Sequence, residues 1–127
     1  MKKMVLALAA SSVLALANET TINETMSLMT QGVNQIQTGF VYSKKEDVVS
    51  GIKILESANA IFTKVDVSTF IANNNKIQVT KNINKNLTAN LKLLNKAVAE
   101  ENYTDATKHY GEVMASCIAC HRIVRGY

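Results

Sequence analysis

The sequence predicts an all-α protein folded as an antiparallel four-helix bundle. Apolar residues recur at steps of three and four along most of residues 18–127, whereas the alternation typical of strands is weak. The chain contains no proline that would interrupt these periodic segments. The connections between the segments are short, apart from one irregular stretch over residues 63–75.

The first two helices are each expected to begin at a capping box. Thr21-Ile22-Asn23-Glu24 places the first start near Thr21, and Ser43-Lys44-Lys45-Glu46 places the second at Ser43. The second helix is expected to end near Phe62. The first helix carries an inward stripe with 3-4-3-4 spacing, made of Met26, Met29, Val33, Ile36 and Phe40.

The second half of the bundle follows the irregular stretch. Three apolar residues of that stretch are expected to return to the core: Val67, Phe70 and Ile71. The third helix is predicted from about Ile77 to Ala99. Asn102 is the predicted N-cap of the last helix, with Asp105 placed near the positive helix end.

The first residues have the pattern of a secretory signal peptide. Met1-Lys2-Lys3 is basic, and residues 4–17 are apolar or small and end in Ala15-Leu16-Ala17. This apolar run is shorter than the roughly 20 residues that a membrane-spanning helix needs. We therefore expect a signal peptide over residues 1–17, a mature domain over 18–127, export to a periplasm, and no stable membrane insertion after cleavage.

The charges of the chain argue against a nucleic-acid partner. The net charge is +4, and it falls to +2 when Lys2 and Lys3 are removed with the predicted signal peptide. The remaining charges are scattered and form no basic patch of the kind that binds nucleic acid.

The only two cysteines lie in Cys117-Ile118-Ala119-Cys120-His121, the C-x-x-C-H pattern of c-type haem attachment. Residues three and four apart share one helix face, so both thiols and the imidazole point to the same side of the helix. The thiols are expected to form thioethers with one haem c, and His121 to bind its iron. A zinc site would need four ligands, and His109 lies too far along the same helix to contribute. A thioredoxin-like site would need a strand before the motif, and no strand is predicted there.

Arginine is used at only two positions, both after the motif. The chain has twelve lysines, whereas Arg122 and Arg125 are its only arginines. Guanidinium groups pair well with carboxylates, so Arg125 is a candidate partner of a haem propionate. The competing interpretation is a basic last turn that complements the helix dipole, which we favour for Arg122.

The run from Cys117 to Arg125 resembles the C-terminal ending of the class II c-type cytochromes, with Val124 in place of the usual aromatic residue. The resemblance implies a four-helix bundle that carries one haem on its last helix, and a homodimer formed through the first two helices. In this family a residue early in the first helix occupies the sixth iron position. A methionine there gives a low-spin electron carrier, and a residue that does not bind iron leaves a five-coordinate site for gases such as nitric oxide.

Met26 and Met29 are the candidates for that sixth position. Both lie on the inward face of the first helix, so periodicity alone does not choose between them. Met26 is favoured because it follows the expected start at Thr21 and because its spacing to the later core positions is similar to that of the family. Met114 is expected to be a core residue, because it shares a helix with His121.

These observations predict a single-haem electron carrier of the periplasm, not an enzyme, that exchanges electrons with partner redox proteins. The first alternative is a five-coordinate gas-binding protein that resembles cytochrome c′. The second is a haem-free helical module that binds other proteins.

Overall fold

The computed structural model describes the backbone of residues 2–126 and the side chains of residues 20–126. Over this range the chain is helical and contains no strand. The elements are α1 (Lys2–Val41), α2 (Lys45–Phe62), the short 3-10 helix η1 (Val67–Thr69), α3 (Asn74–Ala99) and α4 (Tyr103–Arg125). The predicted all-α chain with four helices is thereby confirmed.

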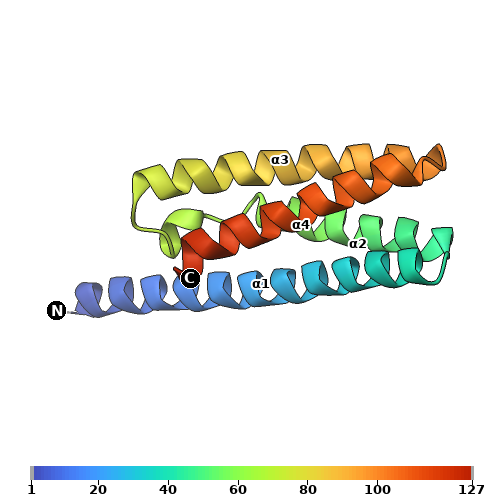
Figure 1. Ribbon diagram of the computed structural model, residues 1–127. Helices are drawn as coiled ribbons and strands as arrows, with labels where there is room; N and C mark the ends of the chain where they lie inside the picture. The colour runs from blue at the N-terminus through green and yellow to red at the C-terminus, as the bar shows by residue number, and fades with distance from the viewer. Residues whose placement is uncertain (1, 127) are drawn as a thin grey trace.

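The four α-helices run alternately in opposite directions and form two hairpins (Figure 1). The backbones of α1 and α2 approach closely along their length, as do those of α3 and α4. The two hairpins meet to a smaller extent through α2 and α3, and α1 and α4 have no comparable approach. The first and last helices, α1 and α4, therefore meet mainly through side chains, as Phe40 and Tyr110 do with ring centroids 5.8 Å apart.

Glycine makes the tight contact of the first hairpin possible. A Cβ atom built on Gly51 would lie 2.7 Å from the carbonyl oxygen of Gly32 and 2.7 Å from the nitrogen of Ile36. A Cβ atom on Gly39 would lie 2.6 Å from the nitrogen of Val48. At these positions any side chain would force the two backbones apart, so α1 and α2 need glycine to pack this closely.

The predicted helix start at Thr21 is wrong, because α1 passes through Thr21 without interruption. The carbonyl oxygen of Thr21 accepts a hydrogen bond from the Thr25 hydroxyl at 2.7 Å, which is an interaction within a helix. The predicted signal peptide, residues 1–17, has its side chains outside the described residues and stays a prediction.

The predicted cap at Ser43 is also wrong. Ser43 adopts a left-handed conformation with φ of 54° and ends α1. Its N–H bonds to the carbonyl of Phe40, and the N–H of Lys44 bonds to the carbonyl of Gly39, the two bonds of a Schellman motif. Lys44 precedes α2 and makes no capping bond with its side chain. The four-residue pattern therefore marks a helix end rather than a helix start.

The later helix boundaries are set by asparagine caps. Asn73 accepts from the N–H groups of Asn75 and Lys76 at the start of α3. At the start of α4, the predicted cap at Asn102 is confirmed: its Oδ1 accepts from the N–H of Asp105 at 3.1 Å, and its Nδ2 donates to the Asp105 carboxylate at 2.8 Å.

The segment between the hairpins returns to the core at two of the three expected residues. Val67 and Ile71 are buried, whereas Phe70 remains exposed. The core that they join is formed by all four helices, with Ile36, Ile52, Leu55, Leu91, Leu94, Val98 and Val113 among its most buried members. Over the described residues, no helix combines the length and the hydropathy that crossing a membrane requires.

We predict that Gly51→Ala lowers the free energy of unfolding by about 1–3 kcal/mol, because the new methyl group forces α1 and α2 apart. Urea unfolding followed by far-UV circular dichroism measures this loss. Gly111→Ala is the matched control, since a Cβ atom there would meet nothing within 4 Å. This control should gain up to about 1 kcal/mol from helix propensity. Equal effects of the two substitutions would contradict the close packing.

Candidate functional site

One apolar cavity of about 250 Å³ lies among the four helices. Its apolar wall is formed by residues of every helix: Met26, Met29, Val33, Phe62, Ile83, Leu87 and Met114. Its polar lining consists of Thr30, Asn84, Ser116, Cys117, Cys120 and His121. The predicted attachment residues on α4 and the two predicted methionines on α1 are therefore brought to the same cavity.

The α4 side of the cavity follows from helical spacing. Met114, Cys117 and His121 stand at i, i+3 and i+7, which places them on one face of α4. Cys120, between Cys117 and His121 in the sequence, widens this face. Both cysteines are free thiols and half-buried, and His121 is also half-buried. The local backbone thus presents two sulfurs and an imidazole to the cavity, as the sequence predicts.

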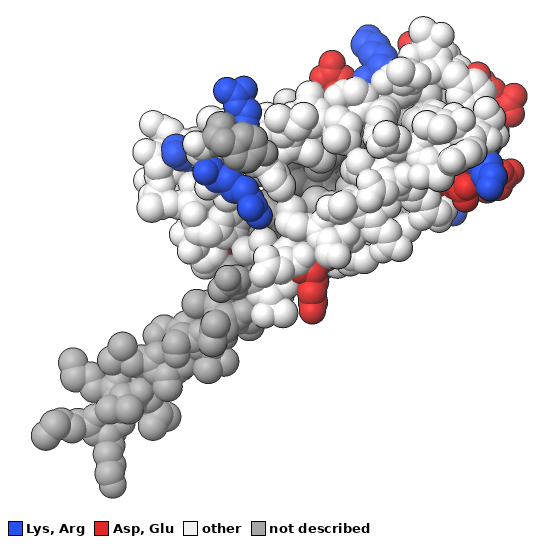
Figure 2. Space-filling view, turned by 60° about the horizontal axis from the view of Figure 1, so that its bottom comes forward, with Lys and Arg blue, Asp and Glu red and all other residues white. Residues whose placement is uncertain are grey.

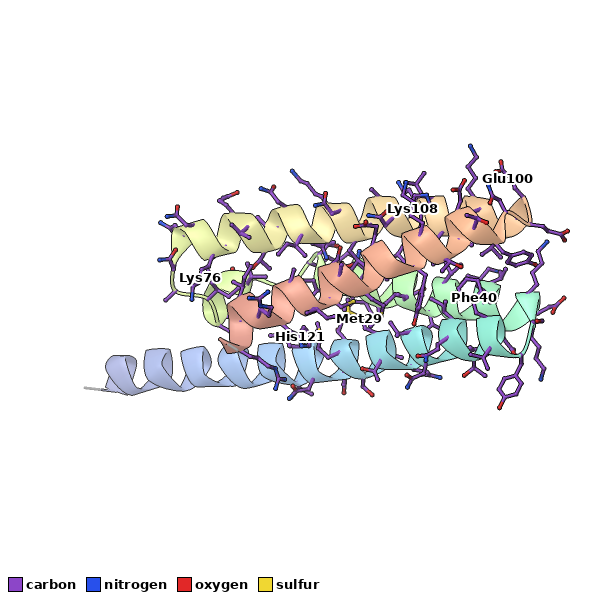
Figure 3. All side chains as sticks on the ribbon, in the orientation of Figure 1. Met29, Phe40, Lys76, Glu100, Lys108 and His121 are labelled. Carbon is purple, nitrogen blue, oxygen red and sulfur yellow. The ribbon has the colours of Figure 1, made fainter. Side chains whose placement is uncertain are left out.

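The α1 side places thioether groups opposite this face. Met29 is 9 % exposed, and Met26 is half-buried and packs against the core. Figure 3 shows Met29 in the space between α1 and α4, with His121 on the C-terminal part of α4. The site therefore consists of two chemically different walls that belong to different hairpins.

A hydrogen-bonded network fixes the wall that α2 and α3 form. Asn59 is 3 % exposed; its Oδ1 accepts from Asn84 at 2.6 Å, and its Nδ2 donates to the Thr88 hydroxyl at 2.9 Å. Thr88 in turn donates to the backbone carbonyl of Asn84 at 3.0 Å. These bonds satisfy a buried amide and hold Asn84 at the cavity wall.

No charged side chain of the described residues lines the cavity. In the space-filling view the surface is hollowed near its middle, and the side chains around the hollow are uncharged (Figure 2). Burial raises the pKa of the Cys117 thiol, with a smaller contribution from Cys120, and burial also raises the pKa of Cys120. Both thiols are therefore protonated at neutral pH, and the cavity suits a large apolar or a soft ligand.

The remaining predicted residues lie outside the cavity. Arg125 is exposed in the last turn of α4, where it forms no ion pair with any residue whose side chain is described. His109 is half-buried, and its Nδ1 lies 3.1 Å from Oδ1 of Asn90 on α3. His109 is thus a structural link between α3 and α4, remote from the C-x-x-C-H motif.

Met114 and Asn84 are among the cavity residues that sequence reasoning did not assign to the site. Met114 was expected to be core alone, yet it lines the cavity beside Cys117. Its position three residues before Cys117 was the signal that places it on the same face. Asn84 carried no such signal, because its role depends on the packing of α3 against α2.

The side chains of residues 20–126 include no group of three histidines, cysteines or carboxylates arranged to hold a metal ion. The donors at the cavity are instead thiols, thioethers and one imidazole. Comparison of the chain with protein-family models, with curated proteins and with solved structures found no match. The resemblance of the C-terminal motif to class II c-type cytochromes therefore stays a prediction.

We predict that the protein with free thiols becomes less stable as the pH rises above about 9, the ordinary thiol pKa. The folded thiols have raised pKa values, so the unfolded state loses its protons first and is favoured at alkaline pH. Each thiol contributes a slope of at most about 1.4 kcal/mol per pH unit. Urea unfolding on both sides of that pH measures the slope, and Cys117→Ala/Cys120→Ala should remove this contribution. An identical pH dependence in the variant would contradict the assigned burial.

Proposed function

We propose that this protein is a c-type cytochrome that carries one covalent haem and transfers electrons in a periplasm. Cys117 and Cys120 would hold the haem through thioether bonds, and His121 would be the proximal iron ligand. The protein would turn over no substrate. Its partners would be redox proteins that dock briefly over a small area.

The observation that carries this proposal is the meeting of the C-x-x-C-H face of α4 with an apolar cavity that has methionines on its opposite side. Two thiols three residues apart and the adjacent imidazole are the donor set that covalent haem attachment uses. A flat apolar macrocycle needs a wall of aliphatic and aromatic side chains, which Val33, Phe62 and Leu87 supply. The residues present therefore fit this group.

Each part of the chain would have a distinct role. When bound, the haem would supply one-electron redox chemistry. The thiols would fix its position on α4, and His121 would set the proximal ligand field. The aliphatic wall would exclude water, and low polarity around the iron is one of the factors that sets a reduction potential.

The sixth ligand is proposed to be Met26, as the similarity of its spacing to that of the class II c-type cytochromes implies. The argument from a helix start at Thr21 no longer applies, because α1 continues through that residue. Met26 and Met29 both line the cavity, and Met29 is the more deeply buried of the two. Burial makes Met29 a packing residue in this proposal, and the half-buried Met26 the ligand.

Arg125 is proposed to pair with a haem propionate. It lies one turn after His121, and its guanidinium group makes no ion pair with a described residue. A guanidinium group that forms no ion pair with a described side chain is well suited to a carboxylate, which it binds through two parallel hydrogen bonds.

We predict that Cys117→Ala or Cys120→Ala reduces covalent haem and that the double substitution abolishes it. Each substitution removes one of the two sulfurs that form thioether bonds. The measurement is haem staining of a denaturing gel after expression with cytochrome maturation machinery. His109→Gln is the control outside the cavity and should stain as the unchanged protein does. Full staining of the double variant would contradict the proposal.

We predict that Met26→Leu converts the oxidised haem protein to high spin and removes the weak sulfur-to-iron absorption band, while Met29→Leu retains both features. Leucine nearly preserves the volume of methionine, so packing should cost less than about 1.5 kcal/mol in either variant. Absorption spectra in both oxidation states measure the outcome. The reverse result would assign the ligand to Met29. No change in either variant would contradict methionine ligation.

A further inference from the structure

The soft donor groups of the chain are concentrated in one place. All three methionines within residues 20–126 line the cavity, together with both cysteines. One of the two histidines is there as well, and only His109 lies elsewhere. Covalent haem attachment would use the two thiols and the imidazole and at most one methionine. The remaining thioether groups therefore have no role in the proposed function beyond packing.

The chemistry of this donor set selects a particular metal ion. Thiolate and thioether sulfur are soft ligands that favour Cu(I), whereas Mg²⁺ and Ca²⁺ require oxygen ligands. No carboxylate of residues 20–126 lines the cavity. A tetrahedral zinc site would need histidine, cysteine or carboxylate ligands, and no three of these side chains within residues 20–126 form such a group. Among the described side chains of the cavity, sulfur donors predominate, and they give a metal that accepts thioether ligands enough donors.

We infer that the chain binds one Cu(I) ion in this cavity when no haem is attached. Cys117 and Cys120 supply thiolates, Met114 supplies a thioether from the same face of α4, and Met29 supplies one from α1. Binding releases the thiol protons to solvent, and the oxidation state of the copper does not change. Haem attachment removes both thiols from this site, so haem and copper exclude each other.

The arrangement of the donors links copper binding to stability. Met29 belongs to the first hairpin, and the α4 donors belong to the second. An ion that is bound from both sides ties together α1 and α4, which otherwise have no close backbone approach. Cu(I) should therefore raise the melting temperature of the haem-free chain, because it binds the folded state through both hairpins.

The test is an anaerobic Cu(I) titration of the full haem-free chain in competition with a chromophoric Cu(I) chelator. The unchanged protein should bind one equivalent. Met114→Leu and Met29→Leu should each weaken binding by about tenfold or more, while His109→Gln should bind as the unchanged protein does. Far-UV circular dichroism verifies that each variant keeps its helices.

X-ray absorption at the copper edge tests the inference on the unchanged protein, without any substitution. It should show more than two sulfur neighbours in the unchanged protein. Two sulfur neighbours, or an affinity that neither methionine substitution alters, would show binding by the cysteines alone and would overturn the inference. Haem staining of Met114→Leu separates the two proposals. Met114→Leu is expected to stain normally. If the unchanged protein does not stain for haem but still binds copper, the cytochrome proposal alone is refuted.

Discussion

The backbones of α1 and α2 meet where Gly32 and Gly51 leave no space for a side chain, and the rest of the fold depends on this contact. It closes the first hairpin on itself, as α3 and α4 close the second. The hairpins then join mainly through α2 and α3, where the Asn84 amide donates a part-buried hydrogen bond to Oδ1 of Asn59. The cavity lies among the four helices, with Met26 and Met29 of α1 on one side and the C-x-x-C-H face of α4 on another. The glycines that close the first hairpin do not line it.

Local patterns in the sequence were sufficient for the helices and insufficient for several of their boundaries, including the start of α3 at Asn74 rather than near Ile77. Apolar periodicity identified all four helices, and Asn102 was correctly assigned because a cap acts within three residues. A capping box shows only that a helix start is compatible with the residues. At Thr21 a continuous helix passes through the same residues, and at Ser43 the end of α1 takes precedence over the start of α2.

The candidate site shows the same division between local and long-range information. Cys117, Cys120 and His121 were predicted to lie together because helical spacing alone brings them together, and the inward stripe predicted the α1 methionines. Met114 was within reach of that reasoning but was assigned to packing. Asn84 was not predictable, because its position depends on Asn59, which is 25 residues away in the sequence and on another helix.

Residues 63–73 are the only covalent link between the two hairpins, and Thr63, Lys64 and Phe70 within them are exposed. Cleavage of this link would divide the chain into two peptides, each a complete pair of antiparallel helices. One peptide would hold the methionines of α1, and the other would hold the thiols and the imidazole of α4. Neither could rebuild the cavity alone. Measuring how the two peptides bind each other would therefore report the association of the hairpins apart from the folding of each hairpin.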